Sequence, residues 1–188
     1  MVTCMHAEQG ASLVEVLVSL LILSVGLLGM AGLQVRLQQA EMEAYQRSQA
    51  LLLLQDMAQR LSANRPAAAS YVTGSGAPLG TGSDCSAAGS SRRDSDLAEW
   101  CAALQGAAEI LGSATSASRV GAMLGGRGCV ESLGQGEYLI TVVWQGLTPL
   151  AAPPQGLACG RGLYDGQPGC RDDLCRRALS TRVRVASS

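Results

Sequence analysis

The sequence is poor in the side chains on which most catalytic and metal sites depend. Its single histidine is His6, and no Cys-x-x-Cys pair and no nucleophile motif occur. Ser/His/Asp and Cys/His catalysis is therefore not expected, and a zinc site would lack its usual ligand pairs. We expect no enzyme activity, no cofactor and no metal centre.

Charged and aromatic residues are scarce too. Charged residues make up 15% of the chain and the formal net charge is -1, so no basic surface for nucleic acid is expected.

The glycines within residues 66–95 do not form a phosphate loop, because no strand precedes them and no Gly-Lys-Ser or Gly-Lys-Thr follows. Neither lysine nor arginine precedes the N-terminal apolar run, which argues against an ordinary cleaved secretory signal.

A long apolar segment lies near the N-terminus. From Val16 to Leu33 the chain carries no charge, and as a helix this segment would span about 27 Å, close to the roughly 30 Å of a bilayer's hydrocarbon core. Glu15 stands directly before it. An acid within a span costs up to about 2.5–3.5 kcal/mol on insertion scales. Glu15 is therefore either a functional group with a partner or an acid at headgroup level, where a helix N-terminus favours negative charge.

The residues around Gly10 resemble a known processing signal. A short polar leader ends in Gly10 and is followed by Ala11 and by SLVEVLVSLLIL, which places Glu15 five residues after the glycine. This arrangement resembles the class III signal of type IV prepilins and of the related pseudopilins. The resemblance implies that a prepilin peptidase cuts between Gly10 and Ala11 and methylates the new amino terminus.

The resemblance also offers Glu15 a partner. After cleavage the α-amine of Ala11 is a cation at the edge of the same apolar environment, and in a filament it can meet the Glu15 carboxylate of a neighbouring subunit. A mispaired charge would stay uncompensated at low dielectric. We therefore expect the pair to set the register of assembly more than to add net stability.

Three glycines recur at every third residue of the run, Gly26, Gly29 and Gly32. They favour either a small-residue face for helix packing in a membrane or a weak section that can unwind when the helix enters a filament, because each glycine costs about 1 kcal/mol relative to alanine. Both interpretations can hold together.

The helix is predicted to continue beyond the span as an amphipathic segment. It should stop near Asn64, because Arg65 precedes Pro66 and is biased away from helical angles. A helix from Ala11 to Asn64 would be about 80 Å long, too long for a domain of this size to cover. The apolar residues at helical spacing in its second half are Leu51, Leu54, Met57, Ala58 and Leu61.

The remaining chain predicts a small mixed domain. Residues 66–95 are rich in Ala, Gly and Ser and predict an irregular loop. Asp96 with Glu99 indicates the start of a second helix, whose apolar positions continue to Leu111.

Three strands are predicted further on. EYLITVVWQ at 137–145 is the strongest, because it is dense in β-branched and aromatic residues, and GCVESLGQG at 128–136 can pair with it. ALSTRVRV at 178–185 alternates apolar and charged side chains. We expect an α+β domain, an antiparallel sheet packed against the long helix, which resembles the pilin fold. The predicted organisation is a leader at 1–10, a hydrophobic helix at 11–33, its amphipathic continuation at 34–64 and a globular part at 65–188.

The cysteines indicate an exported domain. Of seven, Cys4 lies in the leader, so cleavage leaves six, enough for three disulfides with fifteen possible connectivities. Such usage fits an oxidising compartment such as the bacterial periplasm. Spacing alone cannot decide the pairing, but proximity favours Cys85 with Cys101, Cys170 with Cys175 and, by remainder, Cys129 with Cys159.

Two other signals are ambiguous. Arg36 and Arg47 follow the span, and basic residues there favour a cytoplasmic C-terminal domain. We give the cysteines more weight and expect a single-pass inner-membrane protein with a periplasmic domain. Asp165, Asp172 and Asp173 lie in a Gly- and Cys-rich loop and form either a calcium site or a solvated turn.

Three functional hypotheses follow. The six cysteines and the GEYLITVVWQG segment resemble PilV-type minor pilins, low-abundance subunits that help to initiate or cap a type IV pilus used in twitching motility and adhesion. The implied partners are the prepilin peptidase, other minor and major pilins, and the inner membrane. A pseudopilin of a type II secretion system shares the helix but is usually less rich in cysteine. An anchored periplasmic binding protein or enzyme would leave the spacing of Gly10 and Glu15 as a coincidence.

Overall fold

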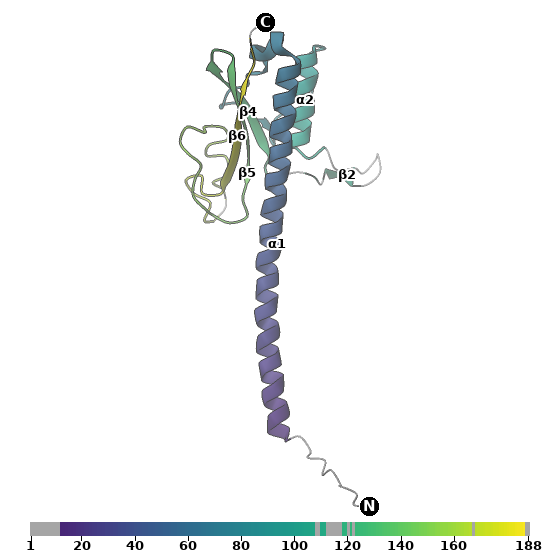
Figure 1. Ribbon diagram of the computed structural model, residues 1–188, viewed down its shortest axis with the longest axis vertical. Coiled ribbons are helices and arrows are strands. Elements are labelled where there is room, and N and C mark those ends of the chain that lie inside the picture. The colour runs from purple at the N-terminus through teal and green to yellow at the C-terminus, as the bar shows by residue number, and fades with distance from the viewer. Residues whose placement is uncertain are drawn as a thin grey trace, which may run out of the picture. The chain divides into compact units, whose positions relative to one another are not determined.

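The computed structural model describes residues 12–107, 110–111, 118–119, 121, 123–166 and 168–186 (Figure 1). The chain divides into two compact parts, Met1–Met42 and Glu43–Ser188. The globular part therefore includes the helical residues from Glu43 onward, and the two parts are described one at a time.

One helix, α1, runs from Leu13 to Ala63 and is drawn in purple to blue in Figure 1. The single long helix predicted from the sequence is thus confirmed. It ends one residue before the predicted Asn64, and a 3-10 helix, η1, follows over Arg65–Tyr71 with a proline near its start. The proline ends α1 because its ring fits the first turn of a new helix better than the interior of an old one.

Every side chain of α1 up to Met42 is exposed. An 18-residue stretch of the helix has a mean hydropathy of 2.5 with none of it buried, so α1 is long and apolar enough to cross a membrane by length and composition. A Cβ placed on Gly26, Gly29 or Gly32 would meet nothing within 4 Å. No contact within the described chain therefore requires a glycine at these positions.

From Glu43 onward α1 is amphipathic and packs on the globular part. Its buried stripe contains Ala50, Leu54, Met57 and Leu61, spaced four, three and four residues apart as one helix face requires. One predicted position is wrong, because Leu51 is 46% exposed. It lies one residue, or about 100°, around the helix from Ala50.

Four strands form an antiparallel sheet in the order β1-β4-β5-β6. β5 coincides with the predicted strand, and the hairpin partner and the C-terminal strand are both present. The loop predicted over 66–95 is more ordered than expected, because it contains most of η1 and all of β1. The strand bounds are Leu79–Gly80 for β1, Arg127–Gly134 for β4, Glu137–Gln145 for β5 and Arg176–Arg184 for β6.

The continuous apolar run of β5 is explained by burial on both of its faces. One face joins the main core with α1, and the opposite face packs under the loop that connects β5 to β6. A strand covered on both sides does not alternate between apolar and polar residues. The side chains toward α1 are Tyr138, Ile140, Val142 and Trp144, and the opposite face holds Val143 with Cys129, Cys159 and Tyr164.

The second helix, α2, spans Arg92–Leu104, and both predicted ends were wrong. It begins earlier because Ser91 and Asp94 form a capping box, each satisfying a backbone N–H of the other. It ends earlier because Gly106 takes a positive φ of 88° just past the last turn. Of the residues predicted to extend it, Ile110–Leu111 form β2, which pairs with β3, Ser118–Arg119.

Trp100 joins α2 to both the sheet and α1. Its indole is fully buried, and its Nε1 donates to the carbonyl of Leu53 at 2.9 Å. A Cβ on Gly128 of β4 would lie 2.2 Å from the indole ring. The glycine is therefore needed for the ring to approach the strand this closely, and the two helices and the sheet share one core.

Candidate functional site

The candidate site begins at the N-terminal end of α1. Gly10 and Ala11, where the sequence predicts cleavage, lie outside the described residues. Glu15 lies in the first turn of α1, where its backbone N–H donates to the carbonyl of Ser12 at 2.9 Å. Within the described residues its carboxylate has neither an ion pair nor a hydrogen bond. Any partner of this charge must therefore come from the undescribed N-terminus or from outside the chain.

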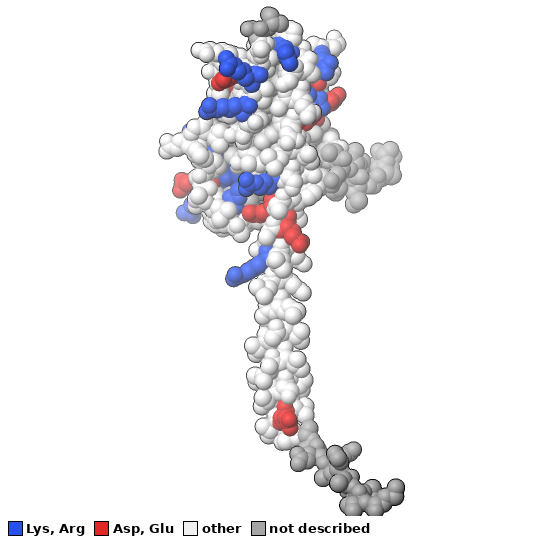
Figure 2. Space-filling model, in the orientation of Figure 1, with Lys and Arg blue, Asp and Glu red and all other residues white. Residues whose placement is uncertain are grey.

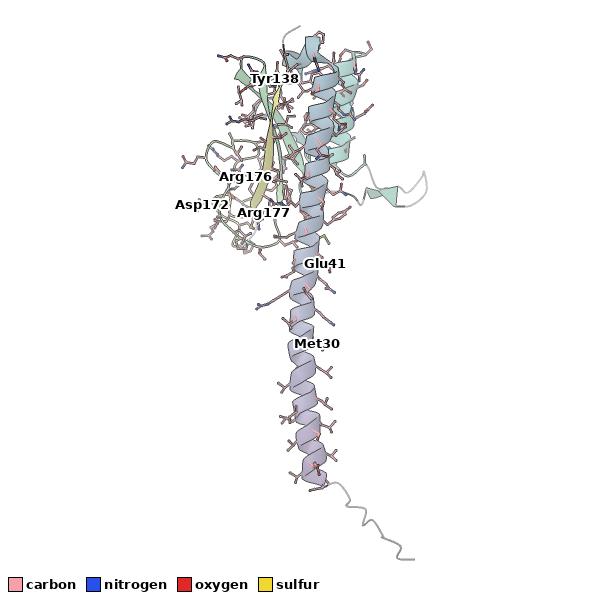
Figure 3. All side chains as sticks on the ribbon, viewed as in Figure 1. Met30, Glu41, Tyr138, Asp172, Arg176 and Arg177 are labelled. Atoms are coloured by element: carbon pink, nitrogen blue, oxygen red, sulfur yellow. A yellow bond between two sulfur atoms is a disulfide. The ribbon has the colours of Figure 1, made fainter. Side chains whose placement is uncertain are left out.

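The exposed segment of α1 that follows Glu15 is almost free of charge. Figure 2 shows this part of the helix as a nearly unbroken white surface, and the side chain of Met30 projects from it in Figure 3. Leu13, Leu28 and Leu33 are 76%, 74% and 64% exposed. A continuous apolar surface of this kind is stable only when lipid or other protein covers it.

Three disulfides hold the globular part together. They join Cys85 to Cys101, Cys129 to Cys159 and Cys170 to Cys175, the pairs that proximity in the sequence favoured. The first links the Gly- and Ser-rich loop to α2, and the second links β4 to the loop after β5. The third closes a short loop directly before β6. Each can stabilise the domain by about 2–4 kcal/mol, because it restricts the conformations open to the unfolded chain.

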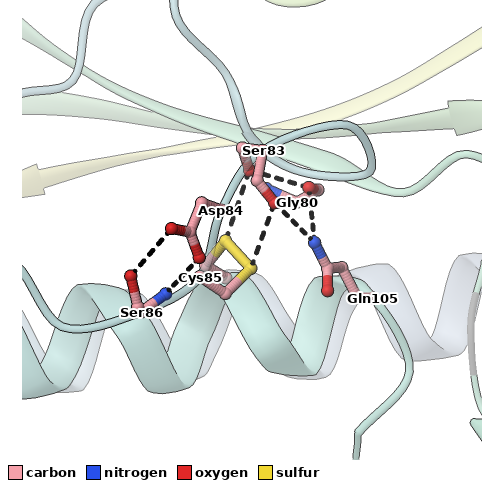
Figure 4. The surroundings of a disulfide bond; sticks show 7 residues. Gly80, Ser83, Asp84, Cys85, Ser86 and Gln105 are labelled. Carbon is pink, nitrogen blue, oxygen red and sulfur yellow. Dashed lines mark hydrogen bonds between the residues drawn. A yellow bond between two sulfur atoms is a disulfide. The ribbon is translucent and has the colours of Figure 1, made fainter.

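The surroundings of the first disulfide show that the Gly- and Ser-rich loop is well fixed (Figure 4). The Gln105 side-chain amide donates to the carbonyls of Gly80 and Ser83, both at 2.9 Å. Beside it, the backbone hydrogen bond from Ser86 lowers the pKa of the Asp84 carboxyl, and the Ser86 hydroxyl adds to this effect. Loop composition alone did not indicate this network.

The acidic loop before β6 is built around a buried ion pair. Arg176 is 1% exposed and donates to Asp173 at 3.1 Å and to the carbonyls of Leu157 and Cys159 at 2.8 and 2.9 Å. The other Asp173 oxygen accepts from the backbone N–H of Gly162 at 2.8 Å. The interpretation of Asp173 as part of a solvated turn is therefore wrong, because its carboxylate is buried against a guanidinium.

The other two aspartates of this loop have different surroundings. Both are exposed, and Asp165 accepts the backbone N–H of Asp173 at 2.9 Å; Asp172 is labelled in Figure 3. Across the part of the chain that the structure describes, no group of three or more His, Cys, Asp or Glu side chains is placed to hold a metal ion. The structure gives the loop an internal ion pair instead of a shared ligand set.

A second ionic cluster joins α1 to α2. Arg60 donates to Asp56 and Asp96 at 3.0 Å and to Glu99 at 2.8 Å. Tyr71 donates its hydroxyl to the other Asp96 oxygen. Burial raises the pKa of Tyr71, and the hydrogen bond to Asp96 raises it further, so the phenol stays a donor.

The third ionic contact connects α1 to the loop after β5. The Glu43 carboxylate accepts from Arg177 Nη2 at 3.3 Å and from the backbone N–H of Leu147 at 3.2 Å. The two charged residues are 134 positions apart, so no local pattern could have predicted the pair. Arg177 also donates to the carbonyl of Thr148 at 2.7 Å, and these contacts fix the start of the loop.

Two family models match adjacent parts of the chain. The prokaryotic N-terminal methylation motif matches residues 5–31, which include Gly10, Ala11 and Glu15, and the type IV pilin Tt1218 model matches residues 32–109. A search of curated proteins and a search of solved structures each found no match. Type IV pilins are a structural family. The methylation motif, the pilin-domain match and the long helix on a disulfide-stapled antiparallel sheet together support a type IV pilin.

Proposed function

We propose that the chain is a minor pilin, a low-abundance subunit that helps to initiate or cap a type IV pilus and so supports twitching motility and adhesion. The observation that carries the proposal is the exposed, nearly uncharged N-terminal part of α1, which begins with a Glu15 carboxylate that has no partner among the described residues. Such a helix needs lipid before assembly and other pilins afterwards. The role is structural, without catalysis.

The minor role in particular is supported by the cysteine framework. Three disulfides in a domain of this size agree with the PilV-type resemblance of the sequence. Disulfides persist in oxidising compartments, so we propose an inner-membrane subunit with a single span and a periplasmic domain before assembly. In the pilus, the three glycines of the span would either pack against neighbouring helices or let the helix unwind.

Processing at Gly10 is the first expected result. In cells that have a prepilin peptidase, the mature chain should begin at N-methylated Ala11, because the methylation motif covers this site. Intact-mass and N-terminal peptide mass spectrometry of the membrane-extracted protein measures the first residue, and a strain without the peptidase is the control. A chain that still begins at Met1 in the peptidase-positive strain, or that begins inside the apolar run, would contradict the class III signal.

The second expected result concerns the assembly that the chain serves. Deleting the gene in its native host should lower the number of surface pili and shrink the twitching zone, and the chain should be recovered in sheared pili in a smaller amount than the major pilin. Electron microscopy, stab-plate assays and quantitative immunoblots provide the measurements. Normal piliation with a loss of extracellular enzyme secretion would reject the pilus role and favour a secretion-system pseudopilin.

A further inference from the structure

A small open pocket lies beside residues 43–47 of α1. It has a volume of about 310 Å³, enough for one or two side chains of a partner. We name it the Trp144 pocket, and it is lined by Glu43, Ala44 and Arg47 of α1, by Trp144 of β5, by Leu150 of the following loop and by Arg177 of β6.

The walls of the Trp144 pocket are held in place without a ligand. Glu43 accepts both from Arg177 and from the backbone N–H of Leu147. On the loop side, the backbone N–H of Leu150 donates to the carbonyl of Leu174 at 2.8 Å. Because the walls are already ordered, binding of a partner there costs little conformational entropy.

The lining combines apolar surface with one unpaired positive charge. Ala44, Trp144 and Leu150 supply the apolar part, and Leu150 is 55% exposed. Glu43 and Arg177 pair with each other, whereas Arg47 has no hydrogen bond or ion pair within the described residues. An apolar side chain with a carboxylate close to it would match this lining.

A helix with that chemistry is present in the chain itself. In the exposed part of α1, Leu37 is 62% exposed and Glu41 follows four residues later, so the two side chains lie on the same helix face. The Glu41 carboxylate has no partner among the described residues, and its side chain projects from α1 in Figure 3. An exposed apolar side chain such as Leu37 is expected to be covered by protein after assembly.

We infer that the Trp144 pocket receives the N-terminal helix of a neighbouring pilin subunit, with an apolar side chain against Trp144 and Leu150 and an acidic one against Arg47. This inference rests on the proposed function, because it needs a filament in which pilins are neighbours. It adds a specific docking site on the globular part to that function.

Photocrosslinking in piliated cells tests the inference. A benzophenone amino acid replaces Leu150 in the full-length chain, and the crosslinked peptides from sheared pili are sequenced by mass spectrometry. The expected product joins the pocket to the N-terminal apolar helix of a pilin. The same probe at Leu163, which is 51% exposed and outside the pocket, should not give that product. Absence of a helix peptide at Leu150, or equal yields at both positions, overturns the inference.

A charge reversal provides a second readout. Arg47→Glu should lower recovery of the chain in sheared pili by about tenfold or more, since an acid would then face an acid. The membrane pool and the disulfides should stay as in wild type. Arg171→Glu makes the same charge change at an exposed arginine outside the pocket and should incorporate normally. Normal incorporation of Arg47→Glu overturns the inference even if Leu150 crosslinks.

The two proposals fail in different ways. If the wild-type chain is absent from pili and its deletion leaves piliation intact, the pilus role fails and the docking site fails with it. If the chain is recovered in pili while the Leu150 probe and Arg47→Glu give the contrary results, only the docking site is wrong.

Discussion

Glu15→Val is expected to leave membrane insertion, leader cleavage and folding intact and to remove the chain from sheared pili. Valine is less costly than glutamate in a membrane span. Within the described chain the Glu15 carboxylate has no partner to lose. What the variant would lose is the pairing with the amino terminus of a neighbouring subunit, and without it the subunit has no charged contact to set its register.

Two companion variants sharpen this test. Glu15→Asp keeps the charge on a shorter side chain and should incorporate at an intermediate level. Ser24→Val adds apolar surface within the same helix but keeps the acid, and within the described residues the Ser24 hydroxyl makes one hydrogen bond, to the carbonyl of Leu21. It should therefore incorporate like wild type.

The measurement is an immunoblot ratio of the sheared-pilus pool to the membrane-retained pool. If Glu15 were only an acid at headgroup level, Glu15→Val would assemble as well as wild type. Equal ratios for the two proteins would end the pairing hypothesis. Loss of the membrane pool together with the pilus pool would also count against it, because the variant was expected to insert and fold.

Local sequence patterns predicted the elements whose residues repeat with a clear period. The long helix was placed correctly from its long apolar run, and the strand at 137–145 from its dense β-branched and aromatic residues. The ends of α2 were misplaced for a different reason. Asp96 has the side chain of a helix-capping residue, but its carboxylate is used by Arg60 and Tyr71, and Ser91 caps the helix instead.

The contacts that fix the loop after β5 could not be read from local pattern at all. Glu43 with Arg177, and Arg176 with the carbonyls of Leu157 and Cys159, join residues that only the folded chain brings together. The cysteines are the exception. Because the six cysteines of the globular part allow only fifteen pairings, proximity in the sequence could rank them before any fold was known.

Arg176→Met is expected to destabilise the globular part by about 3–5 kcal/mol, because it leaves a buried carboxylate without its cation. Arg176 is 1% exposed and Asp173 is 8% exposed. The substitution also removes the donor to the carbonyls of Leu157 and Cys159. These residues lie in the loop that covers the face of β5 opposite α1. We therefore expect that loop to loosen first.

Urea unfolding of the full chain in detergent, followed by tryptophan fluorescence with the disulfides intact, measures the loss. Arg182→Met makes the same change at an exposed position of the same strand and should stay within about 0.5 kcal/mol of wild type. The double variant Arg176→Met with Asp173→Asn should recover part of the lost stability, since no unpaired charge then remains. A single Arg176→Met variant within about 1 kcal/mol of wild type would show that water or a neighbouring group already compensates Asp173, and the ion pair would not be what holds this loop on the sheet.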